Sequence, residues 1–151
     1  MNNEFPRLED RDYQKAFLAD WYTPKKLFVG ERQSGKTELI LSELRRFERN
    51  NLSCLLIAPT LNQLNNIESQ YRYRFEEQLT AQTGTIEKLK RGSLRGYKVD
   101  CVLIDGFHLL DHNTFEHEII PMSPTFIRAS IERSSCRDKD KKLFDSVYTD
   151  E

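Results

Sequence analysis

The chain has 151 residues, of which 31% are charged and 38% are hydrophobic, so it suits one domain with a core of its own. Its 23 basic and 24 acidic residues give a formal net charge of -1, which excludes a global positive field for nucleic acid and leaves only local patches. No apolar run approaches the ~20 residues of a membrane span, so we expect no membrane partner. Three cysteines without metal-type spacing, and the lack of a signal peptide, favour a reducing, cytoplasmic location.

The first predicted elements are a polar segment, a helix and a strand. Residues 1–11 are mostly polar, and we expect them to be loosely attached. Apolar and aromatic residues recur at helical spacing across residues 12–22, which predicts a packing helix that stops before Thr23-Pro24. The short apolar run at residues 26–29 then predicts a strand.

Residues 30–37, with the sequence GERQSGKT, match the phosphate-binding pattern G-x-x-x-x-G-K-[ST] at every fixed position. The match lies between a predicted strand and a predicted helix, which is the context that a P-loop needs; a chance match in a surface turn is the alternative. The glycines let backbone N–H groups face phosphate oxygens, Lys36 would reach the β- and γ-phosphates, and Thr37 would hold Mg²⁺. The predicted ATP-binding residues of this loop are Gly30, Gln33, Ser34, Gly35, Lys36 and Thr37.

Apolar runs and amphipathic stretches alternate after the P-loop. We predict a helix at residues 38–49 and a strand at 52–58, whose nearly continuous apolar run suits burial on both faces. A long polar helix is expected at 61–82 and a short helix at 86–92. Thr83-Gly84-Thr85 indicates a turn between them.

The strand predicted at residues 99–105 is the second part of the expected phosphate site. An apolar strand ending in Asp is the Walker B pattern, and Asp105 follows Lys36 by 69 positions (105 minus 36). Ligands bind at the carboxyl edge of open α/β sheets, so Asp105 should lie beside Thr37 and bind Mg²⁺. A basic run at residues 88–98 precedes this strand and indicates either a solvated face or an edge that contacts phosphates.

The elements after Asp105 are shorter. Residues 114–120 predict a short amphipathic helix, and residues 125–131 alternate like a strand that extends the sheet. Residues 133–142 are highly charged, and we expect them to be mobile, followed by a short helix or disorder. The predicted organisation is a polar segment (1–11), an ATPase-type domain (12–132) and a charged tail (133–151).

These motifs resemble the N-terminal ATPase core of viral large terminases, the motors that package DNA, and the RecA-like lobes of superfamily 2 helicases. The resemblance covers residues 12–131 and rests on Gln14, the Arg-Gln-Ser-Gly-Lys-Thr loop, Ala58-Pro59-Thr60 and the strand that ends at Asp105. It implies an α/β, three-layer P-loop NTPase fold of the RecA-like type, with a mostly parallel sheet flanked by helices.

The resemblance also implies roles for single residues. Gln14 would read adenine through its side-chain amide, with simple packing as the alternative. Arg32 would act as an arginine finger, or else be a surface arginine beside the phosphates. The Ala-Pro-Thr turn would touch a nucleic-acid backbone, or else be an ordinary turn from strand to helix. The catalytic candidates are thus Arg32, Lys36 and Asp105, with ATP and Mg²⁺ as ligands.

The partners implied are nucleic acid, in the first place double-stranded DNA, and ring neighbours or a second lobe or subunit that completes the ATP site. A terminase-like protein of viral origin would act in the host cytoplasm.

The chain departs from this family at Gly106, where the family carries a Glu that positions or activates the attacking water. Loss of a general base typically lowers the rate ~10²–10⁴-fold. Either hydrolysis is impaired or another carboxylate substitutes, and Asp111, Glu116 and Glu118 are close enough in sequence to be candidates.

Three functional hypotheses stay open from the sequence. The first is an ATPase motor core that acts on double-stranded DNA. The second is a non-hydrolysing, helicase-like regulatory module that binds nucleotide, which the glycine at position 106 motivates. The third is a small-molecule kinase, although no arginine-rich lid is evident.

Overall fold

A computed structural model describes residues 12–31 and 34–150. The helices and strands are α1 (Asp12–Ala19), β1 (Lys25–Gly30), α2 (Lys36–Arg49), β2 (Cys54–Ala58), α3 (Leu61–Phe75), β3 (Gln82–Thr85), α4 (Ile86–Lys90), β4 (Cys101–Asp105), α5 (His112–Thr114), β5 (Phe126–Glu132), α6 (Asp138–Lys141) and β6 (Ser146–Thr149). Short 3-10 or π-helical turns lie at Phe107–Leu109, Phe115–Ile119, Ile120–Met122 and Arg133–Ser135. No helix in the two described ranges is long and apolar enough to cross a bilayer.

The strands form one sheet in the order β3-β2-β4-β5-β1-β6, and all neighbours are parallel. β5 therefore lies between β1 and β4, although it follows both in the sequence. Parallel strands are usually covered on both faces, and β2 and β4 are accordingly buried at every residue. The α/β class with a parallel sheet, expected from the sequence, is confirmed.

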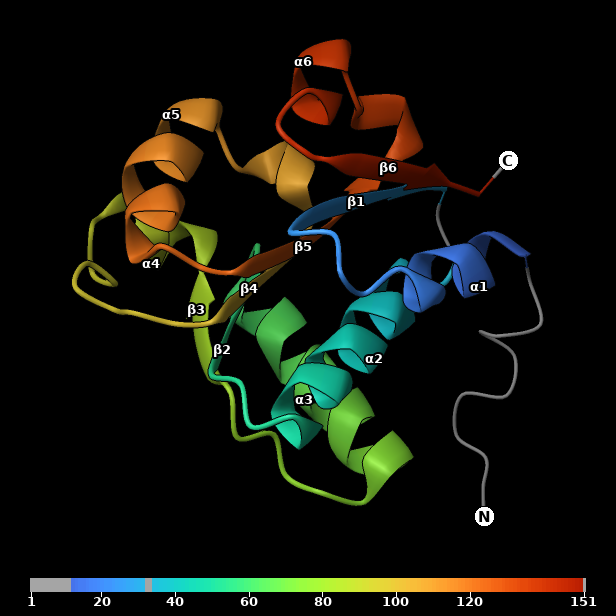
Figure 1. Ribbon diagram of the computed structural model, residues 1–151. Helices are drawn as coiled ribbons and strands as arrows, with labels where there is room; N and C mark the ends of the chain where they lie inside the picture. Colours follow the sequence, from blue (N-terminus) through green and yellow to red (C-terminus); the bar gives the residue numbers. More distant parts are fainter. Residues whose placement is uncertain (1–11, 32–33, 151) are drawn as a thin grey trace.

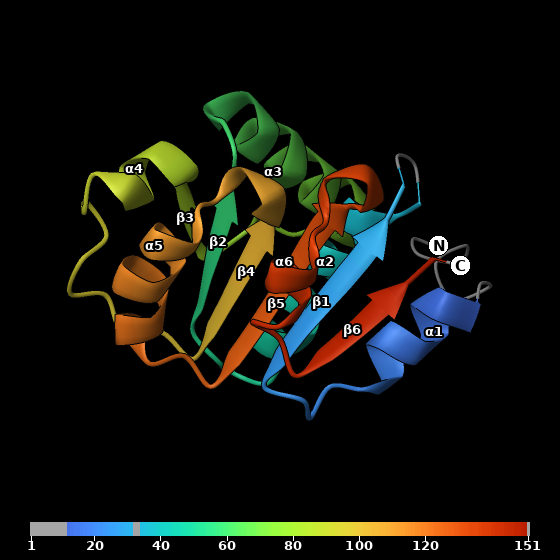
Figure 2. The same ribbon diagram turned by 90° about the horizontal axis from the view of Figure 1, so that it is seen from above.

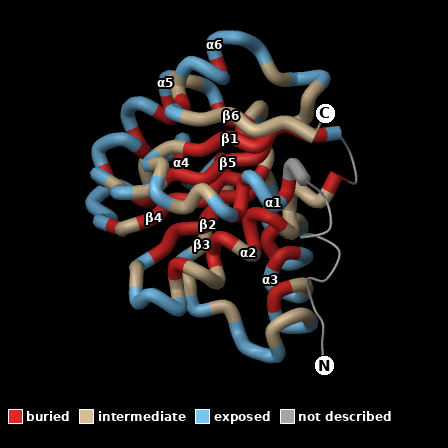
Figure 3. The backbone as a smooth tube through the Cα atoms, turned by 45° about the vertical axis from the view of Figure 1, so that its right-hand side comes forward, coloured by how far each residue is buried: buried red, intermediate tan, exposed pale blue. Residues whose placement is uncertain are grey.

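Helices cover both faces of this sheet, which gives three layers (Figures 1 and 2). α1, α2 and α3 lie against one face, and α4, α5 and α6 lie on the other. Figure 3 shows that the central strands are buried while exposed residues concentrate on the helices and loops around them. All the strands point the same way, so their carboxyl ends share one edge of the middle layer.

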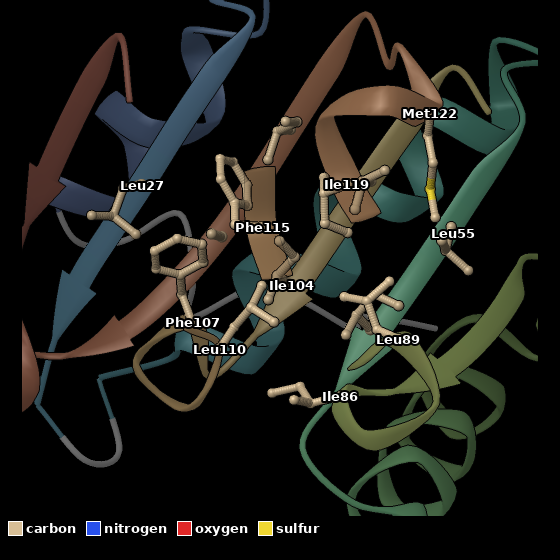
Figure 4. Close-up of a cluster of buried hydrophobic side chains, with 14 of the residues drawn as sticks. Leu27, Leu55, Ile86, Leu89, Ile104, Phe107, Leu110, Phe115, Ile119 and Met122 are labelled. Atoms are coloured by element: carbon tan, nitrogen blue, oxygen red, sulfur yellow. The ribbon is translucent and has the colours of Figure 1, made fainter. Parts of the chain in front are cut away.

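Alternate residues of β2 and β4 contribute to two separate cores. Leu55 points to the side of α4 and α5, where aromatic residues such as Phe107 and Phe115 pack over the strands (Figure 4). Its neighbour Leu56 belongs to the other core, which contains residues of α2 and α3. Because side chains of a strand alternate between faces, the continuous apolar runs supply both cores at once.

The structure differs from expectation at residues 76–85. α3 ends at Phe75, not near residue 82, because Glu76 adopts a left-handed conformation with a φ of 55°. Gln82–Thr85, expected to be a turn, form the edge strand β3 beside β2. Gly84 allows close packing in this strand, since a Cβ added there would lie 2.9 Å from Leu94 Cδ1.

The described part of the charged C-terminal segment also departs from expectation. We expected a mobile stretch followed by a helix or disorder, but residues 146–149 form β6, which pairs with β1. Phe144 precedes this strand and is buried in the core on the side of α4 and α5. Burial of Phe144 and pairing of β6 with β1 therefore order part of a segment that we expected to be mobile or disordered from its charge content.

Three charged side chains are fully buried between α2 and the amino-terminal halves of β1 and β5. Glu43 Oε1 lies 3.3 Å from Lys26 Nζ and accepts a 2.6 Å hydrogen bond from Arg128 Nε. All three side chains are 0% exposed. Burial lowers the pKa of Lys26 to about 8 and also lowers the pKa of Arg128, while the Glu43 carboxylate opposes both shifts.

Backbone carbonyls around the α1–β1 connection complete this buried ion cluster (Lys26, Glu43 and Arg128). The Arg128 guanidinium donates hydrogen bonds to the carbonyls of Trp21, Thr23 and Pro24 at 3.1, 2.9 and 3.1 Å. Lys26 Nζ donates to carbonyl oxygens at the end of α1. A buried charge is tolerated only when paired and hydrogen-bonded, so the cluster ties α1, α2, β1 and β5 together.

We predict that Glu43→Gln destabilises the domain by about 3–5 kcal/mol, because it leaves two buried cations without a counter-charge. Urea unfolding followed by far-UV circular dichroism measures the difference. The matched control is Glu68→Gln on the exposed side of α3, which should change stability by less than about 0.5 kcal/mol. Equal stability of the two variants would contradict the role of the ion cluster.

Candidate nucleotide-binding site

The loop between β1 and α2 starts at the carboxyl edge of the sheet and needs its glycines. A Cβ added to Gly30 would lie 2.4 Å from Ser34 Oγ and 2.9 Å from a ring carbon of Phe28, so a larger residue cannot fit without displacing them. Gly35 has a φ of 88°, in the left-handed region that favours glycine, and precedes the first residue of α2. The backbone thus turns sharply into the helix.

The N-terminus of α2 is suited to an anion. Its N-cap residue, Gly35, has no side chain that could accept from the first backbone N–H groups of the helix. Those donors and the positive end of the helix dipole remain for a ligand such as phosphate. Lys36 and Thr37 occupy the first turn, so their side chains lie beside the same donors.

A cleft of about 530 Å³ lies next to this helix end. That volume is within the range of small-molecule sites, roughly 300–1,000 Å³. The cleft is formed by α2, α3 and the carboxyl ends of β4 and β5, and its lining residues are Gly35, Lys36, Thr37, Glu38, Gln63, Gln70, Asp105, Gly106, His108, Ser130, Ile131 and Glu132. The structure therefore brings Lys36, Thr37 and Asp105 to one cleft, as the spacing of the two motifs predicted.

Asp105 is nearly buried, 7% exposed, and its two carboxylate oxygens are held from different elements. Ser130 Oγ on β5 donates to Oδ1 at 2.9 Å, and Gln63 Nε2 on α3 donates to Oδ2 at 3.0 Å. These donors fix the orientation of the carboxylate toward the cleft. Outer partners of this kind tune a metal-binding carboxylate when a cation is bound.

Lys36 has two partners in the cleft. Its Nζ donates to the carbonyl of Glu31 and lies 3.6 Å from Glu132 Oε2. The Lys36 side chain is 14% exposed and that of Glu132 is 30% exposed, so both reach the solvent in the cleft. The ammonium is therefore held in place but accessible to a phosphate.

The residues present fit a Mg²⁺-bound nucleotide. Mg²⁺ is commonly held by one or two carboxylates together with substrate phosphates and waters. Thr37 supplies a hydroxyl and Asp105 a carboxylate on the same cleft. Among residues 12–31 and 34–150, no group of three or more His, Cys, Asp or Glu side chains is arranged to hold a metal ion.

The backbone at Gly106 adopts a conformation that suits glycine. Its φ is 81°, in the left-handed region, and it caps the 3-10 turn at Phe107–Leu109. A Cβ added there would lie 3.0 Å from Pro59 Cγ. The backbone at this position favours glycine, so a Glu here would be strained.

The three carboxylates expected as substitutes do not line the cleft. Asp111 caps α5 by accepting from Thr114 N at 3.0 Å, and the Thr114 hydroxyl lowers its pKa. Glu118 accepts from Arg95 Nη2 at 2.8 Å, and this hydrogen bond lowers its pKa. Glu116 is exposed elsewhere on the surface. The carboxylates on the cleft besides Asp105 are Glu38 and Glu132.

Gln14 lies against the P-loop rather than on the cleft. It is 1% exposed, and its Nε2 donates to the carbonyl of Ser34 at 3.2 Å. Its buried Oε1 has no hydrogen-bond partner among the described residues. Arg32 and Gln33, for which we predicted an arginine-finger role and ATP binding, lie outside the described residues.

The C-terminal strand braces the entrance of the P-loop. Asp150, after β6, accepts from the backbone N–H of Glu31 at 3.0 Å, and its own N–H donates to the Val29 carbonyl at 3.2 Å. Arg133 bridges the two acids, since it pairs with Glu31 at 3.2 Å and with Asp150. β1 and its loop are thereby tied to the chain that follows β5.

The turn after β2 and the basic run are not among the residues that line the cleft. Thr60 caps α3 by accepting from Gln63 N at 3.1 Å, so its hydroxyl has a structural partner. Two members of the basic run are paired: Lys90 lies 3.6 Å from Asp111, and Arg95 pairs with Glu118. The exposed cations Lys88, Arg91 and Lys98 complete the run.

The solved structures with a similar fold include a flagellar accessory protein and an ATPase core. The flagellar accessory protein FlaH from Methanocaldococcus jannaschii matches with a TM-score of 0.56 and 12% identity, over 88% of this chain and 72% of that chain. The SWI2/SNF2 ATPase core of Sulfolobus solfataricus, in complex with double-stranded DNA, matches with a TM-score of 0.56 and 15% identity, over 87% of this chain and 32% of that chain. No family model and no curated protein sequence matches.

The chain has a RecA-like P-loop ATPase fold. At these identities the likeness concerns the fold alone. The match to the Sulfolobus protein covers about a third of that chain, so this chain corresponds to one part of it.

The sequence analysis missed three polar residues of this candidate site. Gln63 was taken as part of a polar helix, and Glu132 lay just beyond the predicted strand. Ser130 lay within the strand predicted at residues 125–131, and the structure shows that its hydroxyl donates to Asp105. Ser130 and Glu132 could have been identified from their place at the end of a predicted parallel strand, because ligands bind at the carboxyl edge of such sheets.

We predict that Gly106→Ala destabilises the domain by about 1–2 kcal/mol, because alanine disfavours the left-handed conformation. Gly106→Asn should cost less, since asparagine enters that region more readily while bringing the same Cβ near Pro59. Thermal or urea unfolding of both variants measures the difference. Should alanine prove no more disruptive than asparagine, the backbone at position 106 is not the constraint.

Proposed function

We propose that this domain binds Mg·ATP and belongs to a nucleic-acid translocase, most simply a terminase-like DNA-packaging ATPase core. The observation that carries the proposal is the cleft shared by Lys36, Thr37 and Asp105 at the uncapped N-terminus of α2. A lysine, a hydroxyl and a carboxylate beside free backbone donors suit a triphosphate with its cation.

Each part of the site has a separate task in this proposal. The backbone donors of the Gly35–Thr37 turn bind phosphate oxygens, and Lys36 binds the β- and γ-phosphates. Thr37 and Asp105 hold Mg²⁺, which neutralises phosphate charge when bound. Ser130 and Gln63 keep the Asp105 carboxylate directed at the cation. Gln14 supports the loop from behind through its hydrogen bond to the Ser34 carbonyl, and reading of adenine by its amide would require the buried Oε1 to become exposed.

Nucleic acid is the proposed partner of the motor. Support comes from the fold shared with a SWI2/SNF2 ATPase core solved with double-stranded DNA. Lys88, Arg91 and Lys98 offer exposed cations for phosphate contacts in a chain whose net charge is only -1. A ring neighbour or a second lobe would complete the ATP site from the open side of the cleft, and Arg32 remains the proposed arginine finger.

A non-hydrolysing regulatory module is the second candidate. The observation in its favour is Gly106, whose left-handed backbone is unsuited to the Glu that the family carries there. Such a module would bind ATP tightly and release it unchanged. Binding and hydrolysis must therefore be measured separately.

We predict that the purified chain binds a fluorescent ATP analogue in the presence of Mg²⁺, and that Lys36→Ala weakens binding about 10–100-fold. A charge-assisted hydrogen bond contributes roughly 1.5–3 kcal/mol, which corresponds to that factor. Lys139→Ala, an exposed lysine on α6, is the control and should bind like the wild type. Absence of binding by the wild-type chain, or equal binding by Lys36→Ala, would remove the proposed function.

For nucleic acid, we predict that the wild-type chain binds double-stranded DNA with a salt-dependent affinity. The double variant Lys88→Ala/Arg91→Ala should lower the slope of log affinity against log salt by about 1 per cation removed. Fluorescence anisotropy at several salt concentrations measures this slope, with Lys139→Ala as control. An unchanged slope would place the DNA contact elsewhere, and no binding would argue against a translocase.

A further inference from the structure

We propose that Glu132 is the catalytic carboxylate of this ATPase: it accepts the proton of the water that attacks the γ-phosphate, in place of the residue after Asp105. The inference rests on the proposed function, since it assigns the base for hydrolysis of the ATP bound in the same cleft.

The sheet order places Glu132 between the two halves of the site. β5 runs between β1 and β4, and its carboxyl end lies at the edge where the cleft opens. In the strand register Gly30 of the P-loop is opposite Glu132, and Asp105 is opposite Ser130. Glu132 is thus one strand away from the phosphate loop and two residues along from the partner of the cation-binding carboxylate.

The short distance between Glu132 and Lys36 places the Glu132 carboxylate near the proposed phosphate position. Glu132 Oε2 lies 3.6 Å from Lys36 Nζ, the group that would bind the β- and γ-phosphates. A carboxylate at that distance is about one hydrogen-bonded water away from the oxygens that the lysine binds. Its 30% side-chain exposure leaves room for that water.

The other carboxylates of the cleft are committed elsewhere. Both oxygens of Asp105 accept hydrogen bonds, from Ser130 and Gln63, and Asp105 is the proposed Mg²⁺ ligand. Glu38 accepts a 3.2 Å hydrogen bond from Arg74 Nη2 on α3. Among the described residues that line the cleft, Glu132 is the acid that lies beside the proposed phosphate-binding lysine, Lys36.

Phosphate binding changes what Glu132 contacts. In the structure, Lys36 Nζ is shared between Glu132 and the Glu31 carbonyl. A γ-phosphate competes for the ammonium and leaves the carboxylate free to hold a water molecule. The water oxygen then bonds to the γ-phosphorus, the bond from that phosphorus to the β–γ bridging oxygen breaks, one water proton passes to Glu132, and ADP and inorganic phosphate leave.

A purely structural role for the ion pair between Glu132 and Lys36 would have a different effect on hydrolysis in a neutral variant. If Glu132 only balances the charge of Lys36, Glu132→Gln would free the lysine for ATP and leave turnover nearly unchanged. If Glu132 is the base, Glu132→Gln retains ATP affinity, or raises it, while hydrolysis falls about 10²–10⁴-fold.

The test measures binding and cleavage in the same preparations of the full chain with double-stranded DNA present. Binding uses a fluorescent ATP analogue, and cleavage uses single-turnover release of labelled phosphate. We expect Glu132→Gln to bind ATP and to lose hydrolysis. Glu132→Asp, which keeps a carboxylate one methylene shorter, should recover part of the hydrolysis that Glu132→Gln loses. Glu116→Gln, an exposed acid outside the cleft, should match the wild type.

Several outcomes overturn the inference. Hydrolysis by Glu132→Gln within about threefold of the wild type excludes a general base, whose loss costs far more. A wild-type chain that binds ATP but does not cleave it removes the role of Glu132 and leaves ATP binding intact. A wild-type chain that binds no ATP removes both proposals. If Glu132→Gln fails to fold by circular dichroism, Glu132→Asp decides, and hydrolysis at the wild-type rate by this shortened carboxylate refutes the base.

Discussion

The buried carboxylate of Glu43 is the interaction on which the arrangement of the site depends. It pairs with Lys26 on β1 and with Arg128 on β5, and it belongs to α2. These three elements carry the P-loop, its helix and the strand end with Ser130 and Glu132. Because each charge is costly to leave unpaired away from water, the cluster admits little variation in how the elements meet. A contact near the amino ends of the strands thus fixes the geometry at their carboxyl ends.

Because β5 lies between β1 and β4, two carboxylates of the cleft come from the ends of neighbouring strands, with Asp105 on β4 and Glu132 on β5. In this sheet β4 ends in Asp105 and turns at once through a left-handed Gly106. That turn brings the backbone close to Pro59 and leaves no side chain at the position. β5, inserted between β1 and β4, offers Ser130 to Asp105 and Glu132 to Lys36. Orientation of the Asp105 carboxylate and contact with Lys36 therefore both come from the inserted strand.

Local patterns in the sequence predicted the central strands and the two phosphate-site motifs, because these are continuous in the chain. β2 and β4 are apolar runs buried on both faces, and the Gly30–Thr37 pattern needs only its own neighbours. The edge strand β3 contains Gly84 in a short polar stretch, and it exists through pairing with β2. Arg128 and Glu43 are 85 residues apart, and no local pattern indicates that such a pair will be buried together. The contribution of Glu132 likewise follows from sheet order, which periodicity does not reveal.

The C-terminal strand β6 and the residue that follows it also support the P-loop. A loop that binds phosphate through its backbone must hold its N–H groups in place before the ligand arrives. Here the backbone N–H group of Glu31, at the start of the loop, donates to the Asp150 carboxylate. Arg133 forms ion pairs with both Glu31 and Asp150. That arrangement fixes the entrance of the loop while leaving the Gly35–Thr37 end unengaged by a capping side chain. The loop is thus supported by β5, β6 and α2, so the candidate site depends on residues spread over nearly the whole described chain.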